Sequence, residues 1–220
     1  DYNARRDFAR TYEPQGLPGD PGGDDLRFVV QKHDASSLHY DFRIEWDGVL
    51  LSWAVTKGPS RDPSEKRLAV RTEDHPLSYA DFEGTIPKGE YGAGTVMLWD
   101  EGTWEPRGDV EKGLEEGELK MSLHGRRMQG KWVLVHMNTE GKRENWLLIK
   151  EKDNHTGAAD TLTHENTASV RTGRSMKEIA EGATPKGGPK ERKRKAPSFR
   201  KPQLATLVKD APKGDDWWHE

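Results

Sequence analysis

The stretch from Leu38 to Trp46 alternates apolar and polar side chains without a break, and it constrains the fold more than any other part of the chain. One parity is apolar and consists of Leu38, Tyr40, Phe42, Ile44 and Trp46. The other parity consists of His39, Asp41, Arg43 and Glu45. Because successive side chains of a strand point to opposite faces, this pattern predicts a half-buried β-strand. Its polar face would carry a row of side chains roughly 6.5 to 7 Å apart.

The dipeptide Asp47-Gly48 follows directly and is typical of a tight hairpin turn. We therefore expect Val49 to Val55 to pair antiparallel with Leu38 to Trp46. Before the alternating stretch, Arg27 to Lys32 is rich in β-branched residues and predicts a strand that leads into the loop from Asp34 to Ser37.

The rest of the chain up to about residue 153 consists of short apolar runs separated by turn residues. Further strands are predicted over Lys66 to Thr72, Thr95 to Trp99, Gly102 to Glu105, Gly117 to Leu123, Lys131 to Met137 and Asn145 to Lys150. Only Asp109 to Glu116 and Ser175 to Glu181 suggest helices. Many short strands without βα alternation favour an antiparallel sandwich or barrel.

Composition changes along the chain suggest four parts. Residues 1–26 are polar and rich in Gly and Pro, which suggests an arm lying on the domain; residues 27–153 hold the predicted strands. Residues 154–197 become polar and then basic, as in a linker, and residues 198–220 regain apolar character without enough length for a core. The chain begins with Asp1 rather than Met, so we expect it to be a fragment of a longer protein.

Charge and composition limit the possible classes of protein. The chain has no Cys, which excludes disulfides and thiolate metal sites, and its mean hydropathy of -1.00 fits a soluble, cytoplasmic protein without a membrane partner. The net charge is -3, yet residues 186–201 contain eight Lys or Arg and one acid. The remainder is therefore acidic, and any contact with nucleic acid outside the basic segment must be local.

Two imidazoles and a carboxylate lie within nine residues: His33, His39 and Asp41. His39 and Asp41 share a strand face, and His33 precedes a short loop that can fold it over the same point. Such a trio binds one side of a divalent ion and leaves positions open for substrate and water. The sequence therefore predicts a metal site on this strand.

Cationic and aromatic side chains near this strand suggest that the bound group is a phosphate. Arg43 lies on the same strand face as His39 and Asp41. Arg67 and Lys57 are cations on or beside neighbouring strands. Guanidinium donates two parallel hydrogen bonds to phosphoryl oxygens. His75, in a loop with acidic neighbours, is a candidate proton donor or transition-state ligand, and Tyr79 is a candidate for orienting phosphate.

Four motifs carry a resemblance to a known family: Q-K-H-D-A-S-S-L-H-Y-D-F-R, L-S-W-A-V-T-K-G-P-S, R-L-A-V-R-T-E-D-H-P-L-S-Y-A-D-F-E-G-T-I-P and G-E-Y-G-A-G-T-V. Together they resemble the 3′-phosphoesterase module of bacterial DNA ligase D, which acts in non-homologous end joining, over residues from about 5 to 152. The resemblance implies a mainly β, compact antiparallel barrel with short flanking helices, a crescent-shaped groove and a disordered or extended C-terminal tail. It also implies manganese-dependent trimming of 3′ ends, by removal of a terminal ribonucleoside and then of the 3′-phosphate.

The resemblance also implies roles for individual residues. The metal ligands fall on His33, His39 and Asp41, with Mn²⁺ or another divalent transition metal as the cofactor. Phosphate-contacting and catalytic groups fall on Arg43, Lys57, Arg67, His75 and Tyr79, and supporting groups fall on Gln31, Arg6, Asp7 and Glu13. The implied substrates are DNA or DNA/RNA 3′ ends of a primer-template in the bacterial nucleoid.

The end of the chain has a resemblance of its own. Residues 199–220, F-R-K-P-Q-L-A-T-L-V-K-D-A-P-K-G-D-D-W-W-H-E, are similar to the lead-in to the ATP-dependent ligase domain of the same proteins. Because the adenylated lysine would follow this segment, the resemblance implies no ligase activity for the chain as given. The ligase and polymerase domains of one polypeptide are the implied partners.

Two other classes of function fit parts of the pattern. A 2-His-1-carboxylate iron oxygenase also uses two imidazoles and one carboxylate on a β fold, although the surrounding cations disfavour it. A non-catalytic DNA-binding adaptor would instead act through the basic segment 186–201, and its affinity would fall steeply with salt.

Overall fold

One antiparallel sheet dominates the computed structural model, which describes residues 2–16, 25–138 and 144–186. Its strands are β1 Arg27–Asp34, β2 Leu38–Trp46, β3 Val49–Val55, β4 Lys66–Arg71, β5 His75–Pro76, β6 Gly84–Ile86, β7 Gly94–Pro106, β8 Glu118–Gly125, β9 Gln129–His136 and β10 Asn145–Lys150. The short helices are η1 Asn3–Arg5, η2 Leu77–Asp81, α1 Val110–Glu116, α2 Thr161–Glu165 and α3 Met176–Ala180. All described residues belong to the first of two compact units, which ends at Lys190.

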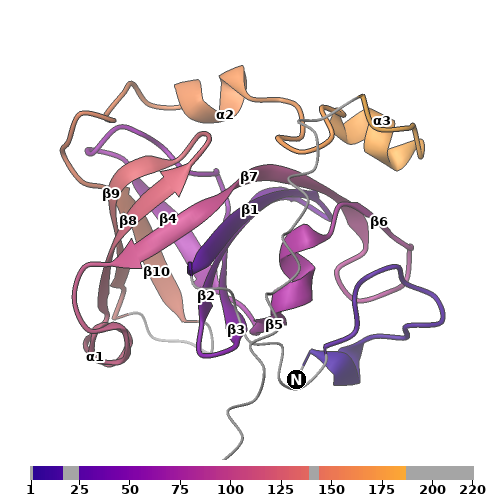
Figure 1. The fold of residues 1–220 in the computed structure, drawn as a ribbon, viewed down its shortest axis with the longest axis horizontal. Helices are drawn as coiled ribbons and strands as arrows, with labels where there is room; N and C mark the ends of the chain where they lie inside the picture. Colours follow the sequence, from indigo (N-terminus) through magenta and orange to yellow (C-terminus); the bar gives the residue numbers. More distant parts are fainter. Residues whose placement is uncertain (1, 17–24, 139–143, 187–220) are drawn as a thin grey trace, which may run out of the picture. The chain divides into compact units, whose positions relative to one another are not determined.

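The sheet closes on itself because β1 pairs with both β2 and β7. The ring runs β1, β2, β3, β4, β10, β9, β8, β7 and back to β1, while β5 and β6 extend it at β3 and β7. Figure 1 shows this barrel with α2 and α3 along its upper rim. The predicted mainly β fold with a closed antiparallel barrel and short flanking helices is confirmed.

The hairpin between β2 and β3 matches the prediction residue by residue. Trp46 pairs with Val49, and the two turn residues Asp47 and Gly48 have φ angles of 46° and 74°. Positive φ at both positions gives the turn a twist that fits the flanking strands, and Asp-Gly accepts it at little cost. The turn thereby sets which side chains of β2 face the barrel interior.

The interior of the barrel holds a large apolar cluster that includes five fully buried or nearly buried tryptophans, Trp53, Trp99, Trp104, Trp132 and Trp146. Tyr40, Phe42 and Ile44 of β2 belong to it, as the apolar parity of that strand predicts. A second cluster lies on the other side of β1, β3 and β7 and contains Tyr2, Val29, Leu50, Leu77, Tyr79, Ala80, Phe82, Ile86, Val96 and Leu98. Both faces of this part of the sheet are therefore covered.

The prediction that β2 is half-buried was wrong for its polar face. Asp41, Arg43 and Glu45 are only 6%, 3% and 3% exposed. Helix η2 and the N-terminal arm pack over this face, which a pattern inside β2 alone does not reveal. Charged groups at such depth need partners, because an unpaired buried charge is strongly destabilising.

Residues 154–186 differ from the expected linker. They contain α2 and α3, and Leu162 and Ile179 from these helices are buried in the interior cluster. Ser175 caps α3 through a capping box with Glu178, which is the N-terminal signal that the sequence shows there. The domain therefore includes this segment, whereas the predicted linker residues 187–197 and the ligase-like residues 198–220 lie outside the described residues.

The two predicted helices are present as α1 and α3, and the segments predicted as Thr95–Trp99 and Gly102–Glu105 form the single strand β7. Helices η2 and α2 were not predicted. Among the described residues, no helix combines the length and apolarity needed to cross a membrane.

Candidate metal centre and phosphate pocket

The three predicted metal ligands meet because of the register between β1 and β2. His33 lies directly opposite His39, so both side chains are on one face, and Asp41 follows two residues later on that same face. One ligand atom from each residue can be chosen such that all three lie within 4.8 Å of one another. This is close to the span of a single ion whose bonds to nitrogen and oxygen are roughly 2.0 to 2.2 Å long.

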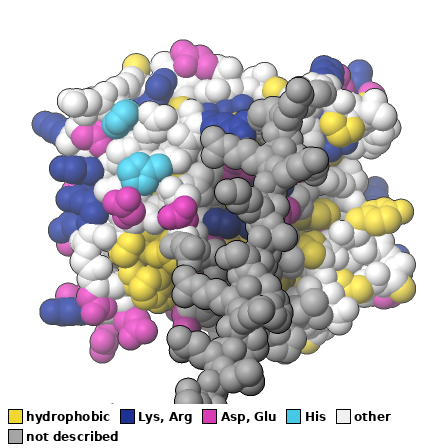
Figure 2. Space-filling model, viewed as in Figure 1, with side chains coloured by type: hydrophobic (Ala, Val, Ile, Leu, Met, Phe, Trp, Pro, Cys, Tyr) yellow, Lys and Arg dark blue, Asp and Glu magenta, His cyan; other side chains and the backbone are white. Residues whose placement is uncertain are grey.

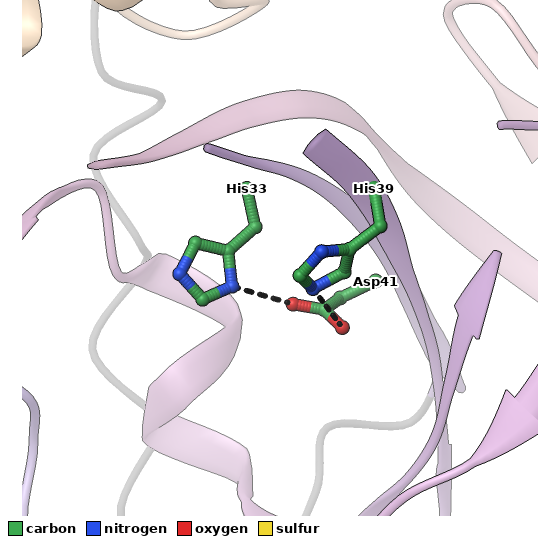
Figure 3. A group of neighbouring side chains, drawn as sticks. All are labelled: His33, His39 and Asp41. Atoms are coloured by element: carbon green, nitrogen blue, oxygen red, sulfur yellow. Dashed lines mark ion pairs between the residues drawn. The ribbon is translucent and has the colours of Figure 1, made fainter. Parts of the chain in front are cut away.

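Backbone carbonyls fix the tautomers of both imidazoles. His33 Nε2 lies 2.9 Å from the carbonyl oxygen of Gly92, and His39 Nδ1 lies 2.9 Å from that of Ser37. Carbonyl oxygens only accept hydrogen bonds, so these outer nitrogens carry the protons. The inner nitrogens, His33 Nδ1 and His39 Nε2, are left with lone pairs at 3.5 and 3.6 Å from the Asp41 carboxylate (Figure 3).

Asp41 is ionised in this setting. Burial raises the pKa of this carboxyl, but the Arg43 guanidinium beside it helps to hold the pKa below its usual value. Two imidazole lone pairs and a carboxylate facing one another repel unless a cation lies among them. The donor set therefore fits a divalent transition metal, and the carbonyls behind the imidazoles are the usual outer partners of metal-binding histidines.

Arg43 lies beside the metal centre and is 3% exposed. Its Nη2 is 3.1 Å from Asp41 Oδ2, and its Nε donates to Gln31 Oε1 at 2.8 Å. Gln31 in turn donates to the carbonyls of Tyr79 and Phe82, so η2 orients the amide that holds Arg43. These contacts occupy only part of the five N–H donors of the guanidinium and leave others for an anion.

His75 contacts Arg43 from the opposite side to Asp41. Its Nδ1 lies 3.0 Å from Arg43 Nη1 and 2.8 Å from the carbonyl oxygen of Glu73. The two contacts require different tautomers, so they exclude each other. Burial and the nearby Arg43 charge lower the pKa of His75 from 6.5 to about 2, which keeps the imidazole neutral at pH 7.

Tyr79 packs beneath both of these groups. Its ring centroid is 4.7 Å from that of His75 and 5.0 Å from the Arg43 guanidinium carbon. Burial raises the pKa of Tyr79 well above 10, so the phenol stays protonated and can donate a hydrogen bond.

The N-terminal arm forms another wall. Arg6 is held by Glu13 through Nε and by Glu73 through Nη1, both at 2.8 Å, and its guanidinium stacks 3.7 Å from the centre of the Tyr2 ring. Arg6 and Glu13 thus reach the site as the sequence predicts. Asp7 does not, because its side chain is exposed and accepts from the backbone of Ala9 in the arm's own turn.

A pocket of about 270 Å³ opens over these groups. Its lining residues are Arg6, Glu13, His33, Ala35, His39, Asp41, Arg43, Ala54, Thr72, Glu73, His75, Tyr79, Ile86, Tyr91 and Gly92. The metal ligands, Arg43, His75 and Tyr79 therefore share one cavity, and Gln31 supports it from below.

Two predicted phosphate contacts, Arg67 and Lys57, do not line this pocket. Asp41 pairs with Ala54, which pairs with Val70, so these three side chains lie on the pocket face of the sheet. Arg67 is three residues before Val70 on β4 and therefore lies on the opposite, interior face, where it pairs with the interior residue Leu148. Its Nη2 contacts Asp160 at 2.6 Å, next to α2. Lys57 is exposed, and its positive charge also helps to lower the pKa of Asp160.

Among the lining residues that sequence reasoning missed, Glu73, Tyr91 and the carbonyl of Gly92 contact other side chains of the pocket. Glu73 lies two residues before His75, a spacing that places both on one side of an extended segment. Tyr91 is an aromatic residue inside the glycine-rich loop between β6 and β7. A loop of this kind is not expected to place a large ring in the core, so the residue suggests a role at the surface. These two patterns were visible signals, whereas the carbonyl contact of Gly92 was not.

Comparison with known proteins shows the family of the chain. The family model described as the DNA ligase D 3′-phosphoesterase domain matches residues 31–136. The multifunctional non-homologous end joining protein LigD of Pseudomonas aeruginosa is 47% identical over 229 aligned positions, which cover 100% of this chain and 27% of that protein.

Two mycobacterial relatives give the same result. The multifunctional non-homologous end joining DNA repair protein LigD of Mycobacterium tuberculosis is 42% identical over 77% of this chain and 23% of its own length. LigD of Mycolicibacterium smegmatis is 44% identical over 69% of this chain and 20% of its own length. The chain spans about a quarter of the curated relatives it matches. It belongs to the family of DNA ligase D 3′-phosphoesterase domains.

Proposed function

We propose that the chain is a metal-dependent phosphoesterase that acts on the 3′ ends of DNA or DNA/RNA strands in end joining. The observation that carries this proposal is the convergence of two imidazole lone pairs on the ionised Asp41, beside a buried arginine with free donors. The proposed reactions are removal of a 3′-terminal ribonucleoside and hydrolysis of the remaining 3′-phosphate.

His33, His39 and Asp41 would hold Mn²⁺ or another divalent transition metal. When bound, such an ion neutralises negative charge on a phosphoryl oxygen and activates an oxygen nucleophile. Arg43 binds a second phosphoryl oxygen with the donors that Asp41, Gln31 and His75 leave free. Because the guanidinium is buried and fixed before substrate arrives, it stabilises the transition state without reorganisation.

His75 and Tyr79 complete the phosphate site. The neutral His75 donates an N–H to a phosphoryl oxygen, and the arrival of a dianion favours its protonated form. In hydrolysis of a 3′-phosphate, the oxygen of water forms a bond to phosphorus, and the bond between phosphorus and the 3′ oxygen breaks. The protonated imidazole of His75 gives its proton to the 3′ oxygen and becomes neutral, while inorganic phosphate leaves with the protons of the water.

Recognition of the strand would be local. On the uncovered part of the face in Figure 2, Lys and Arg side chains are dispersed and lie beside acidic ones. This supports binding by the end of the strand rather than by a wide basic surface. The length of the relatives supports the proposal that ligase and polymerase domains of one polypeptide act on the same end.

The test is phosphate release from a primer-template whose primer ends in a 3′-phosphate, with Mn²⁺ added. We expect His39→Ala and Asp41→Ala to abolish release while circular dichroism and the melting temperature show a folded domain. His124→Ala is the matched control, because that imidazole is exposed and does not line the pocket. Full activity of either ligand variant, or an inactive unaltered chain with every divalent metal tried, would overturn the proposal.

The same samples address the alternatives. An iron oxygenase would require Fe²⁺ and would release no phosphate. A DNA-binding adaptor would bind through residues 186–201, of which only Lys186 is among the described residues, and would keep its affinity in Asp41→Ala.

A further inference from the structure

Tyr91 is an exposed aromatic residue at the mouth of the pocket. Four large apolar or aromatic residues of the described chain are markedly exposed: Tyr12, Leu38, Leu68 and Tyr91. Tyr91 is 49% exposed and is the one of these four that lines the phosphate pocket. A large ring left half in water next to a polar cavity is not explained by packing.

The loop that carries Tyr91 is held in place by contacts on both sides. Gly92, the next residue, accepts the hydrogen bond from His33 Nε2, which ties the loop to the metal centre. Arg5 Nη1 donates to the Tyr91 hydroxyl at 3.1 Å, and Arg10 contacts Glu90 at 3.0 Å, which ties it to the N-terminal arm. The ring is therefore fixed relative to the pocket before any ligand binds.

The surroundings of the ring suit a nucleobase. The guanidinium carbons of Arg5 and Arg6 lie 5.3 and 5.4 Å from its centroid. Arg6 is buried and paired with Glu13 and Glu73, whereas the half-exposed Arg5 lies where it can attract a phosphodiester backbone. A strand whose terminal phosphoryl group enters the pocket necessarily brings its last base to the pocket mouth. Aromatic side chains next to a basic groove bind single-stranded ends by stacking on the base faces.

We propose that Tyr91 is a stacking platform for the last base of the bound 3′ end, and that it positions the terminal phosphoryl group over Arg43. This inference rests on the proposed function of the pocket. Every base has a π face, so stacking on Tyr91 holds the end without selecting its sequence, as end repair requires. Tyr91 is thus a positioning residue and takes no part in the proton transfers.

Fluorescence of a terminal 2-aminopurine tests the contact directly. The probe is a primer-template with 2-aminopurine as the last base and a 3′-phosphate, mixed with the whole chain in EDTA so that the end is not processed. We expect the unaltered chain and Tyr91→Phe to quench the probe, because both retain the ring. Tyr91→Ala should lose the quenching and bind about tenfold more weakly, with a similar loss for each of the four natural bases.

Tyr12→Ala is the matched control, because Tyr12 is 88% exposed but does not line the pocket. Retained quenching and affinity in Tyr91→Ala, or an equal loss in Tyr12→Ala, would overturn the inference. Phosphate release with Mn²⁺ separates this failure from that of the proposed function. If release is normal in the unaltered chain and Tyr91→Ala leaves its KM unchanged, only the inference fails; if the unaltered chain releases no phosphate, the function fails.

Discussion

Arg43 and Arg67 are both nearly buried arginines of the same barrel, but they lie on opposite faces of the sheet. Arg43 is on the outer face of β2, under η2 and the N-terminal arm, and it contacts Asp41, Gln31 and His75 around the pocket. Arg67 is on the interior parity of β4, near the rim of the barrel, where it contacts Asp160 and Glu65.

The difference shows how one residue type can face a cavity in one place and join two parts of the structure in the other. Arg43 has fixed partners and unused donors that face a cavity, so it is ready for an anion. Arg67 contacts Asp160 beside α2, and this pair links the barrel to the segment that covers its rim. A position two strands away from the pocket is therefore not enough to make an arginine a phosphate ligand, because its side chain can lie on the other face of the sheet.

Exchange of each arginine for lysine should give the largest contrast. We expect Arg43→Lys to reduce kcat for phosphate release roughly 10²- to 10³-fold, because lysine cannot reproduce the two parallel donors. Arg67→Lys should reduce kcat far less, since its guanidinium is directed to Asp160. Steady-state kinetics on a 3′-phosphorylated primer measure both. Equal losses would show that the Asp160 pair opens and that Arg67 reaches the phosphate.

The dependence of the unfolding free energy on pH should distinguish the pocket from the barrel rim. The folded state keeps His75 neutral down to about pH 2, whereas the unfolded chain takes up a proton below 6.5. Its contribution to stability is therefore complete above pH 6.5 and is lost as the pH falls. Between pH 6.5 and 5 this loss amounts to about 2 kcal/mol, which His75→Gln should remove.

Urea unfolding in EDTA at the two pH values measures this change. The matched variant is His164→Gln, because His164 is an exposed histidine of α2 at the barrel rim. We expect it to keep the acid sensitivity of the unaltered chain. A pH dependence of unfolding that is the same in all three proteins would contradict the burial of a neutral His75.

The pair at the barrel rim should give the smallest effect. Asp160 is 53% exposed, so water screens its attraction to Arg67, and Asp160→Asn should lower the free energy of unfolding only slightly. Added salt should shrink the difference further. Urea unfolding at low and high salt checks both points, and a large, salt-independent loss would mean that the pair is effectively buried.

The local predictions held where the residues that fix the geometry are neighbours in sequence. β2, its Asp-Gly turn and β3 have their predicted bounds, since alternation and turn chemistry act within a few residues. His39 and Asp41 share a face for the same reason. Helix α3 lies within the predicted range Ser175 to Glu181, whereas α2, which also has five residues, has no side-chain cap and begins after Asp160 in a left-handed conformation.

The remaining features depend on contacts between distant segments. The parity of Arg67 relative to Asp41 depends on the register between β3 and β4, and a ten-residue loop, 56–65, separates these strands. Burial of the polar face of β2 depends on Tyr2 and Leu77, which come from an irregular arm and a short helix. Neither has a periodic signal, so the depth of the pocket could not be predicted from β2.

The pairing of β1 with β7 makes completion of the candidate metal centre depend on contacts between distant parts of the chain. The local pairing of β1 with β2 is enough to bring His33, His39 and Asp41 together, but the Gly92 carbonyl behind His33 lies just before β7, some sixty residues later in the chain. Until β1 and β7 meet, the carbonyl that fixes the tautomer of His33 has no fixed position. High-affinity metal capture should consequently be a late event that slows unfolding more than it speeds folding.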